Sequence, residues 1–356
     1  MSYSEYKRDI CAEIDRVLTG IDHKELMNFV ESCKNAQRIM LIGKGRVGQA
    51  MKAFSIRMNA MGKHSCFLDE TTSFHMTQSD LLVIGNMSGD SKWAGYYVDV
   101  AHHMGISTFY MTSLDGEASD SADGVLHIRA RAYGVAGQNN YTSCQPMSST
   151  AEQCLWLVLD AASYLLADTA GGDRISTILA SISRDVQKNI FAVDEDEIDG
   201  LISSVEGPAA KCFFGRNRLG IILNSFGMRI AHMGYDVHIY GETGWRMPRK
   251  GDILITCISP DYVRVLQSAD DITVESGLYG LCAMQNSVQE EMGAVVLHIP
   301  NACSVRDLPE CALEAPFSED AFCHALYVIL DYIVCKMMES HNWTESVLSQ
   351  RHANIQ

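Results

Sequence analysis

Short, continuously apolar runs alternate with longer amphipathic stretches through this chain of 356 residues. The run at 39–42 precedes a stretch in which Met51, Phe54 and Met58 recur at three- and four-residue spacing, as in a helix with one buried face. Short buried strands that alternate with helices predict a parallel sheet covered by helices on both faces. Further apolar runs of the first half lie at 66–68, 81–85, 108–111 and 125–128, before a long apolar helix expected at about 149–166.

The pattern of the first half recurs 172 positions later along the chain. A Gly-x-x-Arg-x-Gly segment, for example, stands at 43–48 and again at 215–220. A period of this length is that of a whole domain. We therefore predict two copies of one domain, 1–172 and 173–356, with the boundary at an Ala-Gly-Gly-Asp segment. Strands of the second copy are expected at 211–214, 252–257, 280–284 and 295–299.

The first loop that can carry chemistry is Gly-Lys-Gly-Arg-Val-Gly at 43–48, between a predicted strand and a predicted helix. It fits the Gly-x-Gly-x-x-Gly fingerprint of dinucleotide binding, and Asp69 or Glu70 stands where a ribose-binding acid is expected. The second copy argues against a dinucleotide, because it lacks the middle glycine that lets a pyrophosphate approach the backbone. Both copies keep an arginine, Arg46 or Arg218, which indicates either an anion or polyol ligand or a structural salt bridge.

The second loop is Asn-Met-Ser-Gly-Asp-Ser at 86–91, which follows a predicted strand and opens a predicted helix. Hydroxyl groups and free backbone N–H groups around a glycine at a helix N-terminus predict a phosphate cradle. The alternative is ordinary N-capping by Ser88 or Ser91. In the second copy Asp261 replaces the glycine and Pro260 has no N–H to donate, so only the first copy is expected to hold a phosphate.

The order of the motifs resembles the sugar isomerase (SIS) domain family, and most closely its 6-phospho-3-hexuloisomerase branch. The resemblance covers nearly all of each copy. It rests on the arginine-bearing glycine loop, Asp-Glu-Thr-Thr at 69–72, Ser-Gly-x-Ser at 88–91 and Pro-Met-x-x-x-x-Glu at 146–152. It implies an α/β fold of two tandem three-layer αβα sandwiches, each with a five-stranded parallel sheet, and a sugar phosphate as the ligand.

The resemblance also carries over binding positions, residue by residue. Positions 45 and 46 match those that face the sugar in the family, and positions in the segment 86–91 match its phosphate loop. Two serines of the family are missing, because Val47 follows the arginine and an asparagine begins the phosphate loop. The substrate-binding residues implied in this way are Gly45, Arg46, Asn86, Ser88, Gly89, Asp90 and Ser91.

Glu152 matches the catalytic glutamate of the family. Aldose–ketose isomerisation moves a proton between adjacent carbons through an enediol, so it needs one positioned base and donors for an oxyanion, and no cofactor. The alternative role of Glu152 is an acid that stabilises a helix N-terminus. The second copy has Cys323 at the aligned position, which predicts that it is catalytically degenerate. His232 is a second catalytic candidate, which would complement Glu152 from the other copy; the alternative is a structural role at a helix end.

Composition narrows the partners and the location. A net charge of −16 without any basic cluster disfavours nucleic acids and anionic membranes as partners. No apolar run reaches the ~20 residues of a spanning helix, and no signal-peptide pattern opens the chain, so we predict a cytoplasmic protein with reduced thiols. A metal site is disfavoured relative to buried core thiols, although four cysteines lie near His324 in the sequence: Cys303, Cys311, Cys323 and Cys335.

The favoured interpretation is a phosphosugar isomerase whose N-terminal copy is active. Because SIS domains pair, the two copies are expected to form an intramolecular pseudo-dimer, and two chains a homodimer. The main alternative is a regulatory protein that binds a phosphosugar without turnover, which the missing serines and the degenerate second copy favour. A nicotinamide-dependent oxidoreductase is a third possibility.

Overall fold

A computed structural model describes residues 2–89, 91–133, 141–168, 174–249, 251–258, 277–282, 295–300 and 320–352. By their contacts these residues fall into two compact units. The N-terminal unit comprises the described residues of 8–185, and the C-terminal unit comprises 2–7 together with the described residues of 186–352. The domain boundary predicted at 172 and 173 lies outside the described residues.

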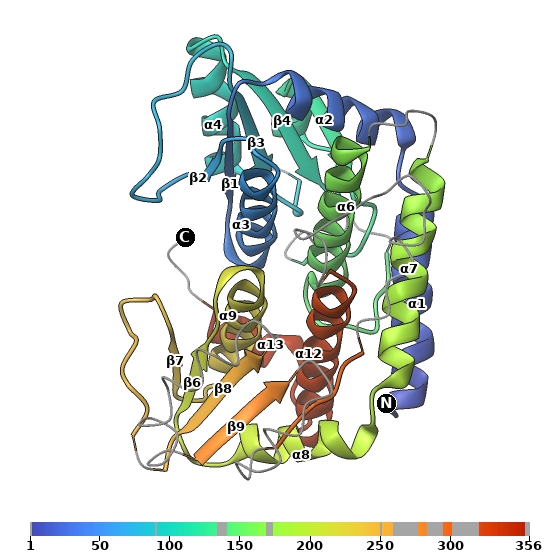
Figure 1. The fold of residues 1–356 in the computed structure, drawn as a ribbon, viewed down its shortest axis with the longest axis vertical. Coiled ribbons are helices and arrows are strands. Elements are labelled where there is room, and N and C mark those ends of the chain that lie inside the picture. The colour runs from blue at the N-terminus through green and yellow to red at the C-terminus, as the bar shows by residue number, and fades with distance from the viewer. Residues whose placement is uncertain are drawn as a thin grey trace. The chain divides into compact units, whose positions relative to one another are not determined.

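The N-terminal unit contains a five-stranded parallel sheet with strand order β2-β1-β3-β4-β5 (Figure 1). The central strands are apolar and almost entirely buried, as their unbroken apolar runs predict. Two helices, α1 (Tyr3–Thr19) and α7 (Ile175–Ala192), contribute residues to both units. The other elements of this unit are α2 (His23–Asn35), β1 (Ile39–Gly43), α3 (Gly45–Ala60), β2 (Ser65–Phe67), β3 (Leu81–Gly85), α4 (Lys92–His103), β4 (Ser107–Thr112), α5 (Glu117–Ser121), β5 (Gly124–His127) and α6 (Ser149–Ala167).

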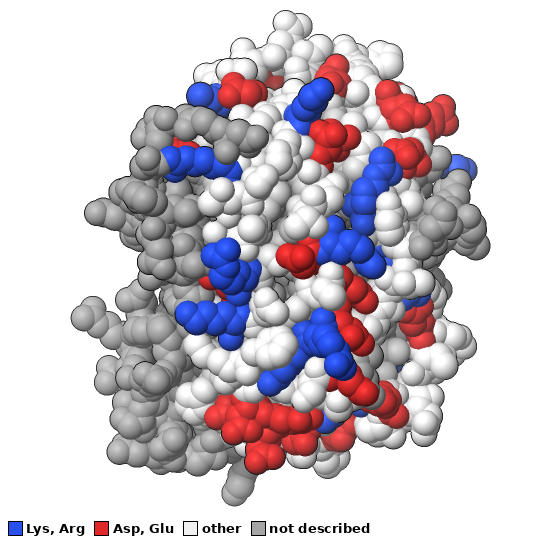
Figure 2. Space-filling model, turned by 90° about the vertical axis from the view of Figure 1, so that its right-hand side faces the viewer, with Lys and Arg blue, Asp and Glu red and all other residues white. Residues whose placement is uncertain are grey.

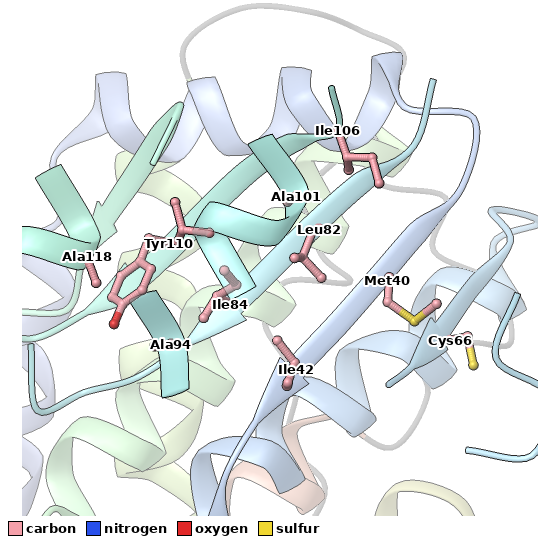
Figure 3. Close-up of a cluster of buried hydrophobic side chains, with 11 residues drawn as sticks. Met40, Ile42, Cys66, Leu82, Ile84, Ala94, Ala101, Ile106, Tyr110 and Ala118 are labelled. Carbon is pink, nitrogen blue, oxygen red and sulfur yellow. The ribbon is translucent and has the colours of Figure 1, made fainter. Parts of the chain in front are cut away.

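Helices cover both faces of this sheet, so the unit has three layers. On one face, apolar side chains of four strands pack against Ala94, Ala101 and other small residues of α4 and α5, which lets the helices lie close to the sheet (Figure 3). On the other face, the ring of Phe29 in α2 lies 5.6 Å from that of Phe54 in α3 and 5.0 Å from that of Phe109 in β4. The predicted parallel α/β architecture is confirmed for this unit.

The two outer glycines of the repeated Gly-x-x-x-x-Gly segment have a packing role. A Cβ at Gly48 would lie 2.5 Å from the carbonyl oxygen of Gly43, and a Cβ at Gly220 would lie 2.6 Å from that of Gly215. Strand and following helix therefore pass so close together that only glycine fits. The spacing of this motif is set by backbone packing in both units, whatever the ligand.

The C-terminal unit contains a parallel sheet with strand order β7-β6-β8-β9, four strands among the described residues. Two long helices, α9 and α12, pack against each other in this unit. The elements are α8 (Glu195–Glu206), β6 (Lys211–Phe214), α9 (Asn217–His232), β7 (Val237–Ile239), β8 (Ile253–Ile258), β9 (Gly277–Cys282), α12 (Asp320–Ser340) and α13 (Glu345–Gln350).

The predicted fifth strand of this unit, at 295–299, is not confirmed. The segment has no regular strand pairing, although Leu297 and Ile299 are buried. Its backbone nevertheless makes the same hydrogen bond to a helix glutamate as in the first copy. The N–H of His298 donates to Glu197 over 2.7 Å, as the N–H of His127 donates to Glu25 over 2.8 Å. The chain at this place therefore follows the same path against its helix without completing the sheet ladder.

One described helix, α12, is long and apolar enough to cross a membrane by length and composition. However, 89% of its most apolar window is buried within the structure, which is the property of a core helix. On the face of the molecule in Figure 2, basic side chains lie among acidic ones and form no separate patch. Neither observation indicates a membrane protein or a nucleic-acid surface.

Candidate active site

Three segments of the N-terminal unit carry the predicted site residues. Gly43 ends β1 and is paired in the sheet with Gly85, which ends β3, so the loops that follow the two strands begin side by side. A Cβ at Gly85 would lie 2.8 Å from the Cγ1 of Val47, which shows how closely α3 passes the end of β3. The third segment is the first turn of α6, which carries Glu152. Ligands of parallel α/β sheets bind at this carboxyl edge.

Arg46 and Glu152 are brought into contact, although 106 positions separate them in the sequence. The Nε of Arg46 lies 3.2 Å from the Oε2 of Glu152, and its Nη1 donates to the hydroxyl of Ser149 over 3.4 Å. The side chain of Arg46 is 2% exposed and that of Glu152 is 12% exposed. Ser149 and Glu152 share one face of the first turn of α6, since they are three residues apart. A guanidinium and a carboxylate therefore lie in contact at a site that is largely buried but still accessible to solvent.

The middle glycine of the first loop has a conformational role. Gly45 begins α3 with a φ of 54°, and Asn217 at the equivalent place in the C-terminal unit has a φ of 51°. This is the left-handed region, which glycine adopts freely and asparagine tolerates better than most residues. A Cβ at Gly45 would also meet no atom within 4 Å. The left-handed backbone at this position is therefore kept in the second copy, although asparagine stands there in place of glycine.

The phosphate loop after β3 is held by its own hydrogen bonds. The side-chain amide of Asn86 donates to the carbonyl of Gly89 over 2.6 Å and to the hydroxyl of Tyr110 over 2.9 Å. Gly89 has a φ of 80°, and the hydroxyl of Ser88 donates to the Oδ1 of Asn86 over 2.9 Å. Asparagine in place of the serine of the family therefore serves as the internal brace of the loop. Asp90, another predicted ligand residue, lies outside the described residues.

The capping alternative for this loop is not what the structure shows. Ser91 is the N-cap residue of α4, but its side chain makes no capping hydrogen bond, and the hydroxyl of Ser88 is directed to Asn86. The first backbone N–H groups of a helix have no partner within the helix. Those of α4 therefore remain suited to an anion, together with the positive end of the helix dipole.

Glu13 is a site residue that sequence reasoning missed. This residue of α1 accepts hydrogen bonds from the Ser143 hydroxyl and the Cys144 N–H, each over 2.7 Å, and from the Thr150 hydroxyl over 2.9 Å. Its carboxylate thereby fixes the segment that opens α6, where Glu152 stands. Burial and the neighbouring Glu13 raise the pKa of the Cys144 thiol, so this cysteine is not a thiolate nucleophile. A single acid on an amphipathic helix gives no signal in the sequence.

Replacing Glu13 with glutamine is expected to lower kcat for the isomerisation proposed below by about 10- to 100-fold, because small misplacements of a catalytic group have costs of this size. KM for the sugar phosphate should change little, since the phosphate loop lies on other elements. Asp15→Asn is the matched control: Asp15 is also on α1 but accepts a hydrogen bond from Ser183 instead. Equal kcat values for Glu13→Gln and Asp15→Asn would refute the positioning role.

The C-terminal unit also has an arginine–carboxylate pair, but its carboxylate comes from a different helix position than in the N-terminal unit. Cys323, the residue aligned with Glu152, is buried. Arg218 instead lies 3.5 Å from Asp320, which is three residues earlier in α12, about one helical turn. The salt-bridge interpretation therefore holds for Arg218, and the pair there is nearly buried, with Asp320 2% exposed.

His232 is the last residue of α9, so it lies at the far end of that helix from Arg218. The residue is 9% exposed, and its ring lies 4.8 Å from the ring of His352, which follows α13. Within its own unit His232 thus contacts the C-terminal segment. Its suggested partnership with Glu152 stays a prediction.

A cavity of about 490 Å³ opens at the amino ends of β3, β4 and β5, the edge opposite to Arg46, and its lining includes amides and hydroxyls but no lysine or arginine. Such a lining does not suit a phosphate.

In the described part of the chain no group of three or more histidines, cysteines or acids could hold a metal ion, and Cys303 and Cys311 lie outside that part.

The fold and the loops at the carboxyl edge define the class: the chain has the SIS-like fold of phosphosugar isomerases. The C-terminal domain of glucosamine-fructose-6-phosphate aminotransferase from Francisella tularensis superposes with a TM-score of 0.68 at 13% identity, over 95% of this chain and 97% of that one. Tagatose-6-phosphate ketose/aldose isomerase from Escherichia coli gives 0.63 at 14% identity, over 96% and 94%.

In sequence, the chain is similar to 3-hexulose-6-phosphate isomerase of Bacillus subtilis (strain 168), with 25% identity over 174 residues. The similarity covers 94% of that protein but 49% of this chain. Nearly the whole of such a relative therefore corresponds to about half of this chain. No protein-family model matches the chain.

Proposed function

We propose that this protein is a phosphosugar isomerase that interconverts an aldose phosphate and a ketose phosphate in its N-terminal unit. The contact between Arg46 and Glu152 is the observation that carries the proposal. It places a carboxylate base and a guanidinium together at the carboxyl edge of a sheet whose neighbouring loop suits a phosphate. The similarity to 3-hexulose-6-phosphate isomerase supports the same class of substrate.

The chemistry follows from these groups. The phosphate, and with it one end of the sugar, is bound by backbone N–H groups of Gly89 and of the start of α4 and by the hydroxyl of Ser91. The hydroxyl of Ser88 joins them by turning from Asn86 to the anion.

Glu152 takes the proton from the carbon beside the carbonyl, which leaves an enediolate, and returns it to the former carbonyl carbon. Between these two steps the hydroxyl proton passes from one oxygen of the enediolate to the other, so that the second oxygen becomes the new carbonyl oxygen. Arg46 pairs with the carboxylate of Glu152 over 3.2 Å, and its fixed positive charge stabilises the oxyanion that develops beside it. One C–H proton and one O–H proton change position and no electron acceptor is consumed, so the reaction balances without a cofactor.

The test is solvent exchange. Ketose and aldose 6-phosphates are incubated with the protein in deuterated water, and the recovered sugars are examined by NMR. We expect deuterium at the carbon that exchanges its proton, together with the isomeric product. Measurable binding without any deuterium would instead favour the regulatory protein. Stabilisation against heat by NAD(H), but not by sugar phosphates, would favour the oxidoreductase.

The homodimeric assembly and the cytoplasmic location belong to the same proposal. They are supported by the likeness to SIS proteins, whose domains pair. Sedimentation of the full chain tests the assembly, for which a strict monomer at micromolar concentration would be the contradicting result.

A further inference from the structure

Lys44 belongs to the first loop of the candidate site, and its side chain reaches the helix that follows the second loop. It is the N-cap residue of α3, its side chain is exposed, and its ammonium group lies 5.3 Å from the centre of the Trp93 ring. Trp93 is the second residue of α4, the helix that begins at the phosphate loop. Among the described residues, this ring is the only partner of the Lys44 ammonium.

The position of Lys44 is electrostatically unfavourable unless an anion is present. A cation at a helix N-terminus opposes the helix dipole. The equivalent N-cap residue of α9 is Arg216, which is also exposed, so both copies carry a cation here. Arg46 differs, because its charge is already balanced by Glu152 at 3.2 Å. The first loop therefore supplies two cations: Arg46, which is paired with a carboxylate, and Lys44, which has no acidic partner among the described residues.

We propose that Lys44 binds the phosphate of the substrate, moving from the Trp93 ring to the anion when the ligand enters. The proposal rests on the function proposed above and identifies the side chain that selects a phosphorylated sugar over a neutral one. The lysine stem is long and flexible, and the contact with an aromatic face at a half-exposed site is weak enough to exchange. Phosphate offers a stronger, charge-assisted hydrogen bond to the same ammonium group.

The position of Trp93 provides a direct readout. Indole fluorescence depends on a charge beside the ring, so departure of the ammonium should change the emission of Trp93. The signal is taken as the difference between the wild type and Trp93→Phe, because the chain has four tryptophans. Inorganic phosphate serves as the probe, which makes the measurement independent of turnover.

The experiment titrates phosphate into the full-length wild type and three variants and measures the affinity by calorimetry, because Lys44→Gln has no ammonium group that could leave the ring. Lys44→Gln should weaken phosphate binding about 10- to 100-fold, the size expected for loss of one hydrogen bond to a charged group. Lys44→Arg should restore most of it. Lys52→Gln is the matched control, since Lys52 is on the same helix and its ammonium lies 4.8 Å from the ring of Phe67, away from α4. This control should bind phosphate as the wild type does.

The outcomes separate the two proposals. Phosphate binding that is equally tight in Lys44→Gln and wild type, in a protein that exchanges deuterium into sugar phosphates, overturns the role of Lys44 and leaves the isomerase standing. Equal weakening by Lys44→Gln and Lys52→Gln also overturns it, because only net charge would then matter. A wild type that neither binds phosphate nor exchanges deuterium overturns both proposals.

Discussion

Glu152→Gln is expected to lower kcat for isomerisation by about 10²- to 10⁴-fold, the usual contribution of a positioned general base. Glutamine has nearly the shape of glutamate and can still accept a hydrogen bond from Arg46, so the local packing should survive. It cannot take a proton from carbon at neutral pH. Phosphate binding should remain close to that of the wild type, because the phosphate loop lies on other elements. Initial rates and deuterium incorporation measure the first effect, and phosphate titration measures the second.

Asp320→Asn is the matched control, since Asp320 is the carboxylate that contacts the equivalent arginine in the C-terminal unit. If only the N-terminal unit is active, this variant keeps its kcat. A thermal melt of each variant separates loss of chemistry from loss of folding. Full activity in Glu152→Gln would exclude it as the base, and equal losses in both variants would show that the second copy takes part.

Arg57→Leu is expected to cause the largest loss of stability, about 3–5 kcal/mol in the free energy of unfolding. The Nη2 of Arg57 in α3 lies 3.8 Å from the Oδ1 of Asp160 in α6, and the two side chains are 1% and 2% exposed. Removing the cation takes away a positive charge 3.8 Å from the buried carboxylate of Asp160, which is costly in a low-dielectric interior. Urea unfolding followed by circular dichroism measures the change.

The double variant Arg57→Leu/Asp160→Leu provides the control. Removing both charges should recover most of the loss, because two apolar side chains no longer bury an uncompensated charge. A double variant as unstable as Arg57→Leu alone would show that packing volume, and not charge, decides stability here. Since α3 and α6 also carry Arg46 and Glu152, this buried pair fixes the two helices on which the candidate site depends.

Much of the N-terminal unit could be predicted because its signals are local. Unbroken apolar runs marked β1 and β3, and three- and four-residue spacing marked α3, since these patterns follow from the geometry of each element alone. The fifth strand expected at 295–299 shows the limit: Leu297 and Ile299 are buried as predicted, but a strand also needs a neighbour in register, which no local pattern records.

Most members of the candidate site could be predicted from the sequence, but their contacts could not. Motif order pointed to Arg46 and Glu152, yet aligned positions suggested that the second copy had lost its carboxylate at Cys323. Asp320 supplies that carboxylate from three residues earlier, because positions three apart share one helix face. Glu13 was missed for a related reason: its role depends on hydrogen bonds to residues 143, 144 and 150, which are far from it in the sequence.

By itself the sequence determined the alternation of strands and helices, the glycine spacing that packs each helix on its strand, and the order of loops that marks a phosphosugar protein. These properties depend on residues close together in the chain. Only the tertiary structure decided which charges meet: Arg46 with Glu152, Glu13 with the start of α6, and Lys44 with Trp93. Such pairs join residues far apart in sequence or on separate elements, and their energies depend on burial and distance, which arise when the sheet and its helices assemble.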